Sequence, residues 1–530
     1  MGPFHPNASG ATVRGLLRRL AARPWLCVLL PALCAFVLAA IPTLVVGAPE
    51  PLIHDEWGYL LSGETFAEGR LTNETHPFWI HFETPHQLHQ PSYQSKYPPA
   101  QALFLALGQR LWHPILGVWL SVACLIGALV WMLQAWLPGR WALAGGLLGV
   151  AQFVVQGQPY FGGATGYWSQ SYWGGAVAAM GGALLFGGLA RTLRSPRVSS
   201  SLVLGLGLMV LANSRPREGL LVALPVALYL LVWMVSSRSP RLPLVLGRVV
   251  LPVLACLVPG FMAMGKYHKA VTGDALEMPW MAHYEQYCVF PVFLWQEPEP
   301  DREWRHMELR DFHGGLELEF HERHAGAQQL LWISAAKLGR FWIFFIGPVL
   351  SVLLLLLPWV LRDPWMRFLC IPVLLVVGVG LVSFGALPHY SAPVAGPMLA
   401  LLLQGLRHLR SRSRGLMLLI ALGMLLGTAS GLVRSTRDVV QSQAVYRNTI
   451  QRGFDERPGE HLVFVRYGPE HTLGDEWIYN AADIDGSKTI WARSMDEAHN
   501  QALIAAYPER QVWVIEVGFE TLSPLPKPYR

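Results

Sequence analysis

Two neighbouring carboxylates, Asp55 and Glu56, are the residues of this sequence best placed for chemistry. They lie in the run His-Asp-Glu-Trp-Gly-Tyr, a few residues after a long apolar segment at 25–47. Carboxylates beside a membrane are costly to desolvate. A carboxylate within about 3 Å of a hydroxyl proton, in a site that excludes water, can act as a general base. We therefore interpret the pair as candidates for acid–base work or binding, and the alternative is a solvated loop.

A lysine follows in the same loop, in the run Lys96-Tyr97-Pro98-Pro99. A lysine just before a Pro-Pro turn can offer its ammonium to a phosphate as a point charge. Lys96 and Tyr97 are therefore predicted to bind substrate. An acid near the membrane together with a cation that holds a phosphate fits transfer from a lipid-phosphate donor.

Two arginines, Arg215 and Arg217, separate two later apolar segments in the run Arg-Pro-Arg-Glu218. The order of the apolar segments places them on the same side as Asp55, against the usual cytoplasmic bias of arginine. Bidentate recognition of a phosphate or pyrophosphate is a good reason for arginine there. The alternatives are an internal Arg–Glu pair, or a local topology that makes this an ordinary cytoplasmic loop.

Aromatic and hydrogen-bonding residues gather in two further segments. His283 and Glu285 belong to a long polar loop, and His389-Tyr390 lies between two apolar segments. Sugar rings stack on aromatic faces while their hydroxyls bind polar groups. We therefore predict that these four residues line a substrate site, although aromatic residues at a membrane interface are common without any ligand.

The first polar loop is rich in histidine, which raises the possibility of a metal site. The ligands available for Zn²⁺ there are His76, His81, His86, His89 and Glu83. Their spacings fit no established metal-binding signature, and Pro and aromatic residues interrupt them. We therefore expect no metal site in this loop.

The composition predicts a protein that crosses a membrane many times. Of 530 residues, 52% are hydrophobic and only 14% are charged. A soluble protein of this length would carry far more charge. The net charge of +6 does not indicate nucleic acid, because the basic residues cluster in short loops between apolar segments. The positive-inside rule accounts for that placement.

Apolar runs long enough to cross a bilayer predict a mainly α fold with about eleven transmembrane helices. The predicted spans are 25–47, 115–136, 141–156, 173–190, 200–213, 217–236, 248–264, 342–361, 367–386, 392–406 and 415–433. Residues 98–112 are apolar but short and begin at Pro-Pro, so we expect an interfacial or re-entrant helix there.

Clusters of arginine set the predicted sidedness. Residues 1–24 and four loops are basic and should be cytoplasmic. These loops are 191–197, 236–248, 362–367 and 407–414. The transmembrane domain, 25–433, would then present its loops 48–97 and 265–337 on the opposite, extracytoplasmic side, together with the C-terminal tail.

The tail, 434–530, has the character of a small α/β domain. Residues 461–467 and 511–517 are rich in Val, Phe, Ile and Trp and predict strands, and 488–493 predicts a third. Ser494-Met-Asp-Glu is a capping-box pattern that opens a helix to about residue 506. We therefore expect an extracytoplasmic α/β domain that docks on the membrane part.

Four features together make the chain resemble a C-type (GT-C) glycosyltransferase, the superfamily of protein O-mannosyltransferases and of the aminoarabinose transferases of lipid A. They are the acidic pair in a long first loop, Lys96-Tyr-Pro-Pro entering an apolar helix, the many spans, and the soluble tail. The resemblance is best over residues 25–240 and points to uncharacterised bacterial members of the superfamily.

The resemblance implies a function and a location. Such enzymes move a sugar from a polyprenyl-phosphate donor to a hydroxyl or amine of a lipid, glycan or protein, with inversion. Asp55 matches their base, with Glu56 as neighbour or alternate, and Lys96 matches the lysine that contacts the lipid phosphate. The expected place is the bacterial inner (plasma) membrane, with the site on the periplasmic side.

The resemblance also bears on cofactors, because the loop 157–172 lacks the acidic metal ligand of oligosaccharyltransferases and holds no Asp or Glu. We therefore expect no required cofactor, although a divalent metal stays possible. The main rival reading is a transporter or lipid flippase, which would show inverted repeats and charges deep within its spans. No internal repeat is present, and a non-catalytic scaffold is a more distant third.

Overall fold

The computed structural model describes most of the chain, with gaps. The described residues are 23–156, 166–236, 239–299, 302–324, 326–383, 385–474, 476–519 and 525–529. The predicted cytoplasmic N-terminus, 1–24, lies outside them except for its last two residues. Residues 157–165 of the predicted loop 157–172 lie outside them as well.

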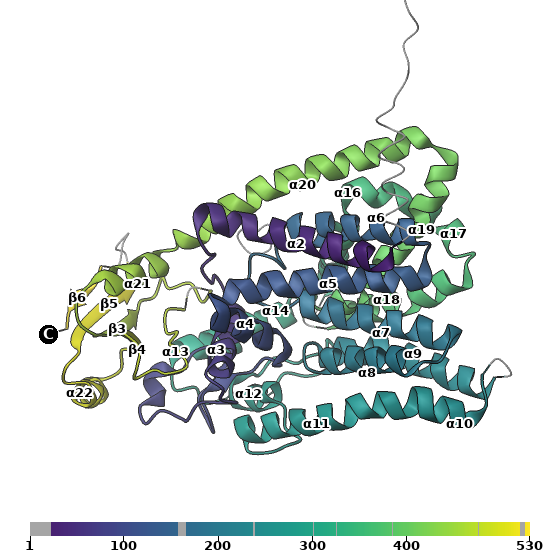
Figure 1. The fold of residues 1–530 in the computed structure, drawn as a ribbon. Coiled ribbons are helices and arrows are strands. Elements are labelled where there is room, and N and C mark those ends of the chain that lie inside the picture. The colour runs from purple at the N-terminus through teal and green to yellow at the C-terminus, as the bar shows by residue number, and fades with distance from the viewer. Residues whose placement is uncertain are drawn as a thin grey trace, which may run out of the picture.

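Long apolar helices make up most of the described structure (Figure 1). Seven of them are long and apolar enough to cross a membrane. They are α2 (Pro24–Val46), α5 (Pro114–Trp136), α7 (Ala176–Arg194), α9 (Pro216–Val235), α10 with η3 and α11 (Leu242–Thr272), α18 (Pro364–Val382) and α20 (Arg414–Gln443). The chain is therefore a multi-pass membrane protein, as its composition predicts.

The predicted count of eleven spans is not confirmed. An eighth span is made if α15 (Ala327–Phe345) is joined to the helical stretch Gly347–Val360, but the two are bent by 84°. That stretch comprises α16 (Gly347–Leu350), η5 (Ser351–Leu356) and α17 (Leu357–Val360). The predicted span 342–361 contains this break, because Gly347 has a φ of 69° that interrupts the helix.

Three other predicted spans correspond to shorter or more basic helices. Gly139–Val155, comprising α6 (Gly139–Gly149) and η2 (Val150–Val155), and α8 (Val198–Ala212) are apolar but short. α19 (Ala395–Arg412) follows the short η6 (Ala392–Val394) and ends in arginines. Their positions match the prediction, and only their lengths and charges keep them from being counted as spans.

The predicted short helix after Pro-Pro is present as α4 (Ala100–Leu111). It packs against α5 so closely that a Cβ on Gly117 would meet the carbonyl oxygen of Phe104 at 1.9 Å. Small residues allow this approach between helices. Leu103 and Leu107, four residues apart on the other face, are exposed. An interfacial place for α4 fits this pattern and stays a prediction.

Small elements lie between the helical bundle and the C-terminal sheet (Figure 1). The first loop provides α3 (His54–Ala67), η1 (Trp79–Phe82), β1 (Gln87–Leu88) and β2 (Gln94–Ser95). The long loop provides α12 (Pro279–Tyr287), α13 (Met307–Arg310), η4 (Asp311–Leu316) and α14 (Glu317–Glu322). β1 and β2 pair as an antiparallel hairpin.

The predicted small α/β unit is present in the tail. Its elements are α21 (Tyr446–Glu456), β3 (His461–Tyr467), β4 (Thr489–Arg493), α22 (Glu497–Ala506), β5 (Gln511–Val517) and β6 (Lys527–Pro528). The strand order is β4-β3-β5-β6, with β3 parallel to both neighbours. α21 and β6 were not predicted, α22 is capped by Asp496 rather than Ser494, and the predicted boundary at 434 falls inside α20.

The sheet packs against the first loop through shared apolar side chains. Leu61, Phe82 and Tyr93 of that loop form one buried cluster with Phe464 and Ile490 of the sheet. Burial of this kind is the main favourable term in docking two parts of a chain. The C-terminal unit is therefore packed on the loop that carries Asp55.

Arg493 of β4 ties three segments together by charge. Its side chain is 3% exposed, and it lies 2.9 Å from Glu476 of its own unit and 2.9 Å from Glu308 of the long loop. It also donates to the backbone oxygen of Glu83 in the first loop, at 3.0 Å. A buried cation needs such partners. Arg493 therefore couples the tail to both loops.

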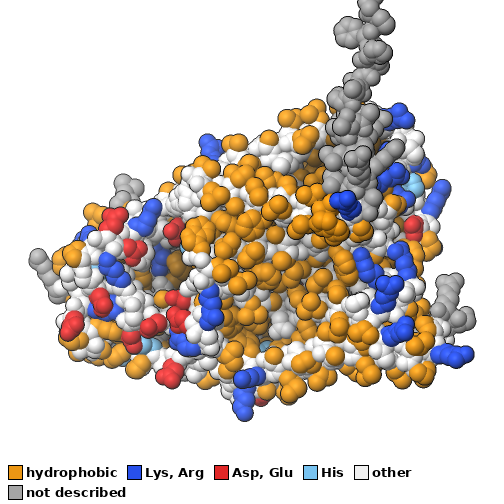
Figure 2. Space-filling view, viewed as in Figure 1, with side chains coloured by type: hydrophobic (Ala, Val, Ile, Leu, Met, Phe, Trp, Pro, Cys, Tyr) orange, Lys and Arg blue, Asp and Glu red, His pale blue; other side chains and the backbone are white. Residues whose placement is uncertain are grey.

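Side chains are distributed as a membrane protein requires (Figure 2). A broad belt of hydrophobic side chains covers the helices. Lys and Arg gather at the end away from the sheet, whereas Asp and Glu lie mainly around the C-terminal unit, where some Lys and Arg are also present. The predicted sidedness requires this distribution and itself stays a prediction.

Replacing Arg493 by Ala should destabilise the docked C-terminal unit by about 3–5 kcal/mol, because the buried carboxylate of Glu476 and the half-buried carboxylate of Glu308 lose their partner. Arg466→Ala is the matched control, since its pair with Glu516 is exposed and worth about 1 kcal/mol or less. Thermal unfolding of the purified variants measures the difference. Equal midpoints for both variants would contradict the role of Arg493.

Candidate active site at the membrane boundary

α3 begins directly at the carboxylate pair and is held at its first turn. The ring of His54 is hydrogen bonded to the hydroxyl of Tyr479 and, through Nε2, to the carbonyl of Leu473 at 3.0 Å. Trp57 stacks on Tyr479 with ring centroids 4.7 Å apart. An acidic residue in the first turn is favoured by the helix dipole. The C-terminal unit thus fixes the end of α3 that carries Asp55.

The β1–β2 hairpin brings His86 and Lys96 together. Gln87 pairs with Ser95, so the residues that flank the hairpin face each other. The backbone N–H of Lys96 donates to the carbonyl of His86 at 3.3 Å. His86 has a φ of 68°, a left-handed conformation that is uncommon for residues other than glycine. This turn at the base of the hairpin lies beside Asp55.

Asp55, His86 and Tyr97 form the centre of the site. Nδ1 of His86 lies 3.0 Å from Oδ1 of Asp55 and 2.9 Å from the Tyr97 hydroxyl. Burial alone raises the pKa of Asp55, but the hydrogen bond and charge of His86 and the charge of Lys96 outweigh it and hold the pKa below its usual value. Asp55 is therefore an ionised carboxylate at neutral pH.

Two cations lie near this carboxylate without a direct partner among the described residues. Lys96 is 7% exposed, and its Nζ lies 5.6 Å from the centre of the Tyr97 ring. The guanidinium of Arg215 lies 4.8 Å from the centre of the Tyr390 ring. Neither cation forms a hydrogen bond or ion pair with a described residue. A largely desolvated cation is stabilised by an anionic ligand.

Backbone contacts explain why Arg215 reaches a site built by the first loop. The N–H of Ala100, at the start of α4, donates to the carbonyl of Asn213 at 2.9 Å. This bond joins the Pro-Pro segment to the connection between α8 and α9. Tyr97 of that segment stacks on Tyr59 of α3, with ring centroids 4.6 Å apart. The predicted residues Asp55, Lys96, Tyr97, Arg215 and Tyr390 are therefore brought together.

Arg217 is paired internally. Its Nε and Nη2 both donate to Oε1 of Glu218, at 2.8 and 2.7 Å. Arg217 therefore forms the internal Arg–Glu pair that the sequence left open as an alternative. The guanidinium of Arg215 is not in this pair and could bind a ligand.

The Glu56 carboxylate is held by backbone hydrogen bonds. Its two carboxylate oxygens accept the backbone N–H groups of Leu52 and Tyr172, at 2.8 and 2.9 Å. Burial raises the pKa of Glu56 to about 7, against the two hydrogen bonds. Glu56 therefore joins two loops from a position beside Asp55, and its side chain is already occupied.

Of the remaining predicted site residues, two are buried near the site and one is not. His389 is fully buried and hydrogen bonded to the Tyr167 hydroxyl, behind Tyr390. His283 is buried next to His86, with ring centroids 6.1 Å apart. Glu285 has an exposed side chain on α12, and the structure does not bring it to the site. On a nine-residue helix, His283 and Glu285 are two positions apart and face different ways.

Sequence reasoning missed Tyr59 and Glu317 as neighbours of the site and considered His86 only as a metal ligand. Tyr59 follows Asp55 by four residues, so the helical period could have placed it on the same face. His86 reaches Asp55 through the register of the hairpin, which short strands do not reveal. Glu317 lies 4.0 Å from Nε2 of His86 and is far away in sequence.

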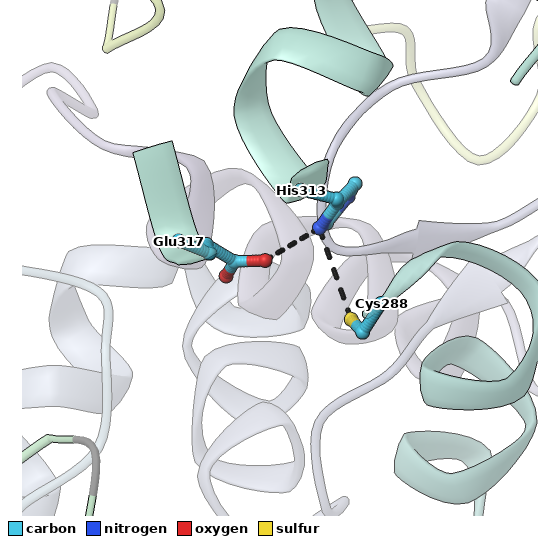
Figure 3. A group of neighbouring side chains, drawn as sticks. All are labelled: Cys288, His313 and Glu317. Atoms are coloured by element: carbon cyan, nitrogen blue, oxygen red, sulfur yellow. Dashed lines mark hydrogen bonds and ion pairs between the residues drawn. The ribbon is translucent and has the colours of Figure 1, made fainter. Parts of the chain in front are cut away.

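Two other histidines of the first loop, His76 and His81, contact the C-terminal unit. His76 contacts Asp485 at 3.1 Å, and Nδ1 of His81 is hydrogen bonded to the Arg493 carbonyl at 2.9 Å. The described residues that could hold a metal ion are instead Cys288, His313 and Glu317 in the long loop (Figure 3).

The raised pKa of Glu56 predicts a pH-dependent stability. The folded state binds a proton more tightly than the unfolded state, so this contribution is complete below about pH 4.5 and is lost as the pH rises through about 7. Wild-type protein should lose one to a few kcal/mol more than Glu56→Gln between about pH 5 and 8.5. Unfolding midpoints measure this, with exposed Glu509→Gln as control. A parallel pH profile for Glu56→Gln and wild type would refute it.

Comparisons with known proteins give similar structures but no match in sequence. No protein-family model and no curated protein matches the chain. An oligosaccharyltransferase of Archaeoglobus fulgidus, in complex with zinc and sulfate, is 11% identical with a TM-score of 0.49, over 92% of this chain and 67% of that one. ArnT of Cupriavidus metallidurans, bound to undecaprenyl phosphate, is 14% identical with a TM-score of 0.48, over 96% and 93%.

A further structure is the oligosaccharyltransferase AglB of Archaeoglobus fulgidus with an inhibitory peptide and a dolichol phosphate. It is 9% identical with a TM-score of 0.47, over 92% of this chain and 69% of that one. These proteins are GT-C membrane glycosyltransferases, the superfamily that this sequence resembles. At TM-scores below 0.5 the likenesses carry no weight for the activity, which has to be inferred from the site.

Proposed function

We propose that the protein is a GT-C-type glycosyltransferase that moves a sugar from a polyprenyl-phosphate donor to an acceptor hydroxyl or amine, with inversion. The observation that carries the proposal is the juxtaposition of the Asp55 carboxylate with the cations of Lys96 and Arg215. A base and two cations without an ion-pair partner among the described residues, at a membrane boundary, suit a reaction whose leaving group is a lipid phosphate.

The proposed reaction is a single displacement at the anomeric carbon. Asp55 takes the proton of the acceptor as its oxygen or nitrogen bonds to the sugar. The bond from the sugar to the phosphate oxygen breaks, and polyprenyl phosphate leaves with the electron pair. Lys96 and Arg215 stabilise the charge that develops on the phosphate, and each charge-assisted contact is worth about 1.5–3 kcal/mol.

His86 positions the base. Its bond to Oδ1 of Asp55 fixes one carboxylate oxygen, and the Tyr97 hydroxyl is also hydrogen bonded to this carboxylate. The chemistry calls on no cofactor, because polyprenyl phosphate is already a good leaving group and the two cations take up its charge.

The proposed setting is the bacterial inner (plasma) membrane, with about eleven crossings and the site on the periplasmic side. Arginines at the opposite end of the bundle support this orientation (Figure 2). The donor would enter from the membrane, and the acceptor would be a lipid, glycan or protein on the side of the C-terminal unit.

Asp55→Asn should lower the turnover of sugar transfer by about 10²–10⁴-fold, because an amide cannot accept the proton. The measurement is initial turnover with labelled polyprenyl-phosphate sugars in lipid. Asp455→Asn makes the same chemical change at an exposed position of α21 and should keep full activity. An Asp55→Asn protein with wild-type turnover would remove Asp55 as the base.

Lys96→Ala should weaken donor binding by about 10- to 100-fold, the equivalent of one lost charge-assisted contact. Donor affinity is measured by titration with a non-hydrolysable polyprenyl phosphonate. Lys488→Ala, at an exposed lysine of the C-terminal unit, is the control, and Lys96→Arg should retain most of the affinity. Unchanged affinity in Lys96→Ala would mean that another group holds the phosphate.

A further inference from the structure

Three potential metal ligands meet in the long loop, below the Asp55–His86 pair. Cys288, His313 and Glu317 are 2%, 0% and 9% exposed. One ligand atom from each lies within 4.8 Å of the others. Figure 3 shows a nitrogen of the His313 ring directed between the Glu317 carboxylate and the Cys288 sulfur.

The local fold sets this arrangement. His313 and Glu317 are four residues apart on one continuous helical stretch, and therefore share a face. The stretch is π-helical over Asp311–Leu316, and single turns of this kind are frequent at functional sites. Cys288 follows directly after α12 and is brought to the pair from 25 positions away in the sequence.

The distances are close to those of a tetrahedral zinc site. Zinc lies about 2.0–2.3 Å from nitrogen, oxygen and sulfur ligands, so neighbouring ligand atoms are roughly 3.5 Å apart. Nδ1 of His313 lies 3.8 Å from Sγ of Cys288 and 2.6 Å from Oε2 of Glu317. The His313–Glu317 separation has to open by less than about 1 Å, and the ligand atoms of Cys288 and Glu317 lie within 4.8 Å of each other.

A second imidazole nitrogen lies at a similar distance from the Cys288 sulfur. Nδ1 of His283, on α12, is 3.9 Å from Sγ of Cys288. Its side chain is 1% exposed. His283 is not in the group whose ligand atoms all lie within 4.8 Å of one another, so its ring would have to move toward His313 and Glu317 to complete a site without water, the usual condition of a structural zinc site.

We propose that Cys288, His313 and Glu317 bind one Zn²⁺, with His283 as the nearest side chain for the fourth position. A thiolate with imidazoles and a carboxylate selects zinc over Mg²⁺ or Ca²⁺, which prefer oxygen ligands. Binding releases the thiol proton, while the proton between His313 and Glu317 moves to Nε2 of His313 so that Nδ1 can bind the ion. The negative charges of one thiolate and one carboxylate then balance the ion, so the site adds no net charge beside Lys96.

The bound ion would join two parts of the long loop and hold them beneath the site. The free oxygen of Glu317, Oε1, lies 4.0 Å from Nε2 of His86, whose other nitrogen contacts Asp55. Zinc on Oε2 would therefore fix the group that faces His86. The inference concerns a structural site and holds whether or not the protein transfers sugars.

Metal analysis of the purified full-length protein tests the proposal. After dialysis against a weak chelator, mass spectrometry should find about one zinc per chain in wild type and less than about a fifth of that in Cys288→Ala and His313→Ala. Cys124→Ala, at an exposed cysteine of α5, should keep the zinc. Zinc that is absent from folded wild type, or equal in Cys288→Ala, would overturn the proposal.

Cobalt gives a second readout that needs no activity. Stripped wild-type protein titrated with Co²⁺ should develop a thiolate-to-cobalt absorption band and the visible bands of tetrahedral cobalt. Cys288→Ala should lack the thiolate band. The wild-type spectrum tests the proposal even if the variant fails to fold. Wild-type protein that binds cobalt without a thiolate band would reject Cys288 as a ligand.

Discussion

The buried guanidinium of Arg493 is the contact on which the arrangement of the extracytoplasmic side depends. It joins the C-terminal sheet to Glu308 of the long loop and to the backbone of the first loop at Glu83. A cation with so little exposure is stable only with such partners, so the three segments are held in one relative position. The connection between β3 and β4, through Tyr479, holds the first turn of α3. The position of Asp55 is therefore set partly by a domain that begins some 400 residues later in the sequence.

Charged side chains around the site are already paired, whereas two cations within the site are not. Arg217 and Glu218 neutralise each other, and Glu56 binds two backbone N–H groups. Lys96 and Arg215, by contrast, contact aromatic rings and have no ion-pair partner among the described residues. The Asp55 carboxylate offsets part of the charge of these two cations, and an anionic ligand would stabilise them further. This difference separates the residues proposed to bind the donor from those that maintain the loops.

Local patterns predicted much of the fold, and long-range contacts limited the prediction of the site. Strands at 461–467 and 511–517 match β3 and β5 to the residue, because alternation and β-branched side chains are local signals. The 84° break near Gly347 was not predicted, because the sequence there is a continuous apolar run that gives no sign of a bend. Asp55 and Lys96 were predicted from their types and positions, and the structure places them close together. Glu285 was predicted in the same site but lies exposed on α12, because a loop sequence does not reveal which face of a short helix is buried.

The central claim is that the donor is cleaved at this site, and a single ³¹P measurement tests it most directly. Wild-type protein in lipid vesicles would be given a polyprenyl-phosphate sugar with an acceptor extract, and the phosphorus signal followed over time. The account predicts that the phosphodiester signal of the donor is converted to the phosphomonoester signal of free polyprenyl phosphate. A donor that moves between leaflets and stays a diester would contradict the account and identify a lipid transporter instead.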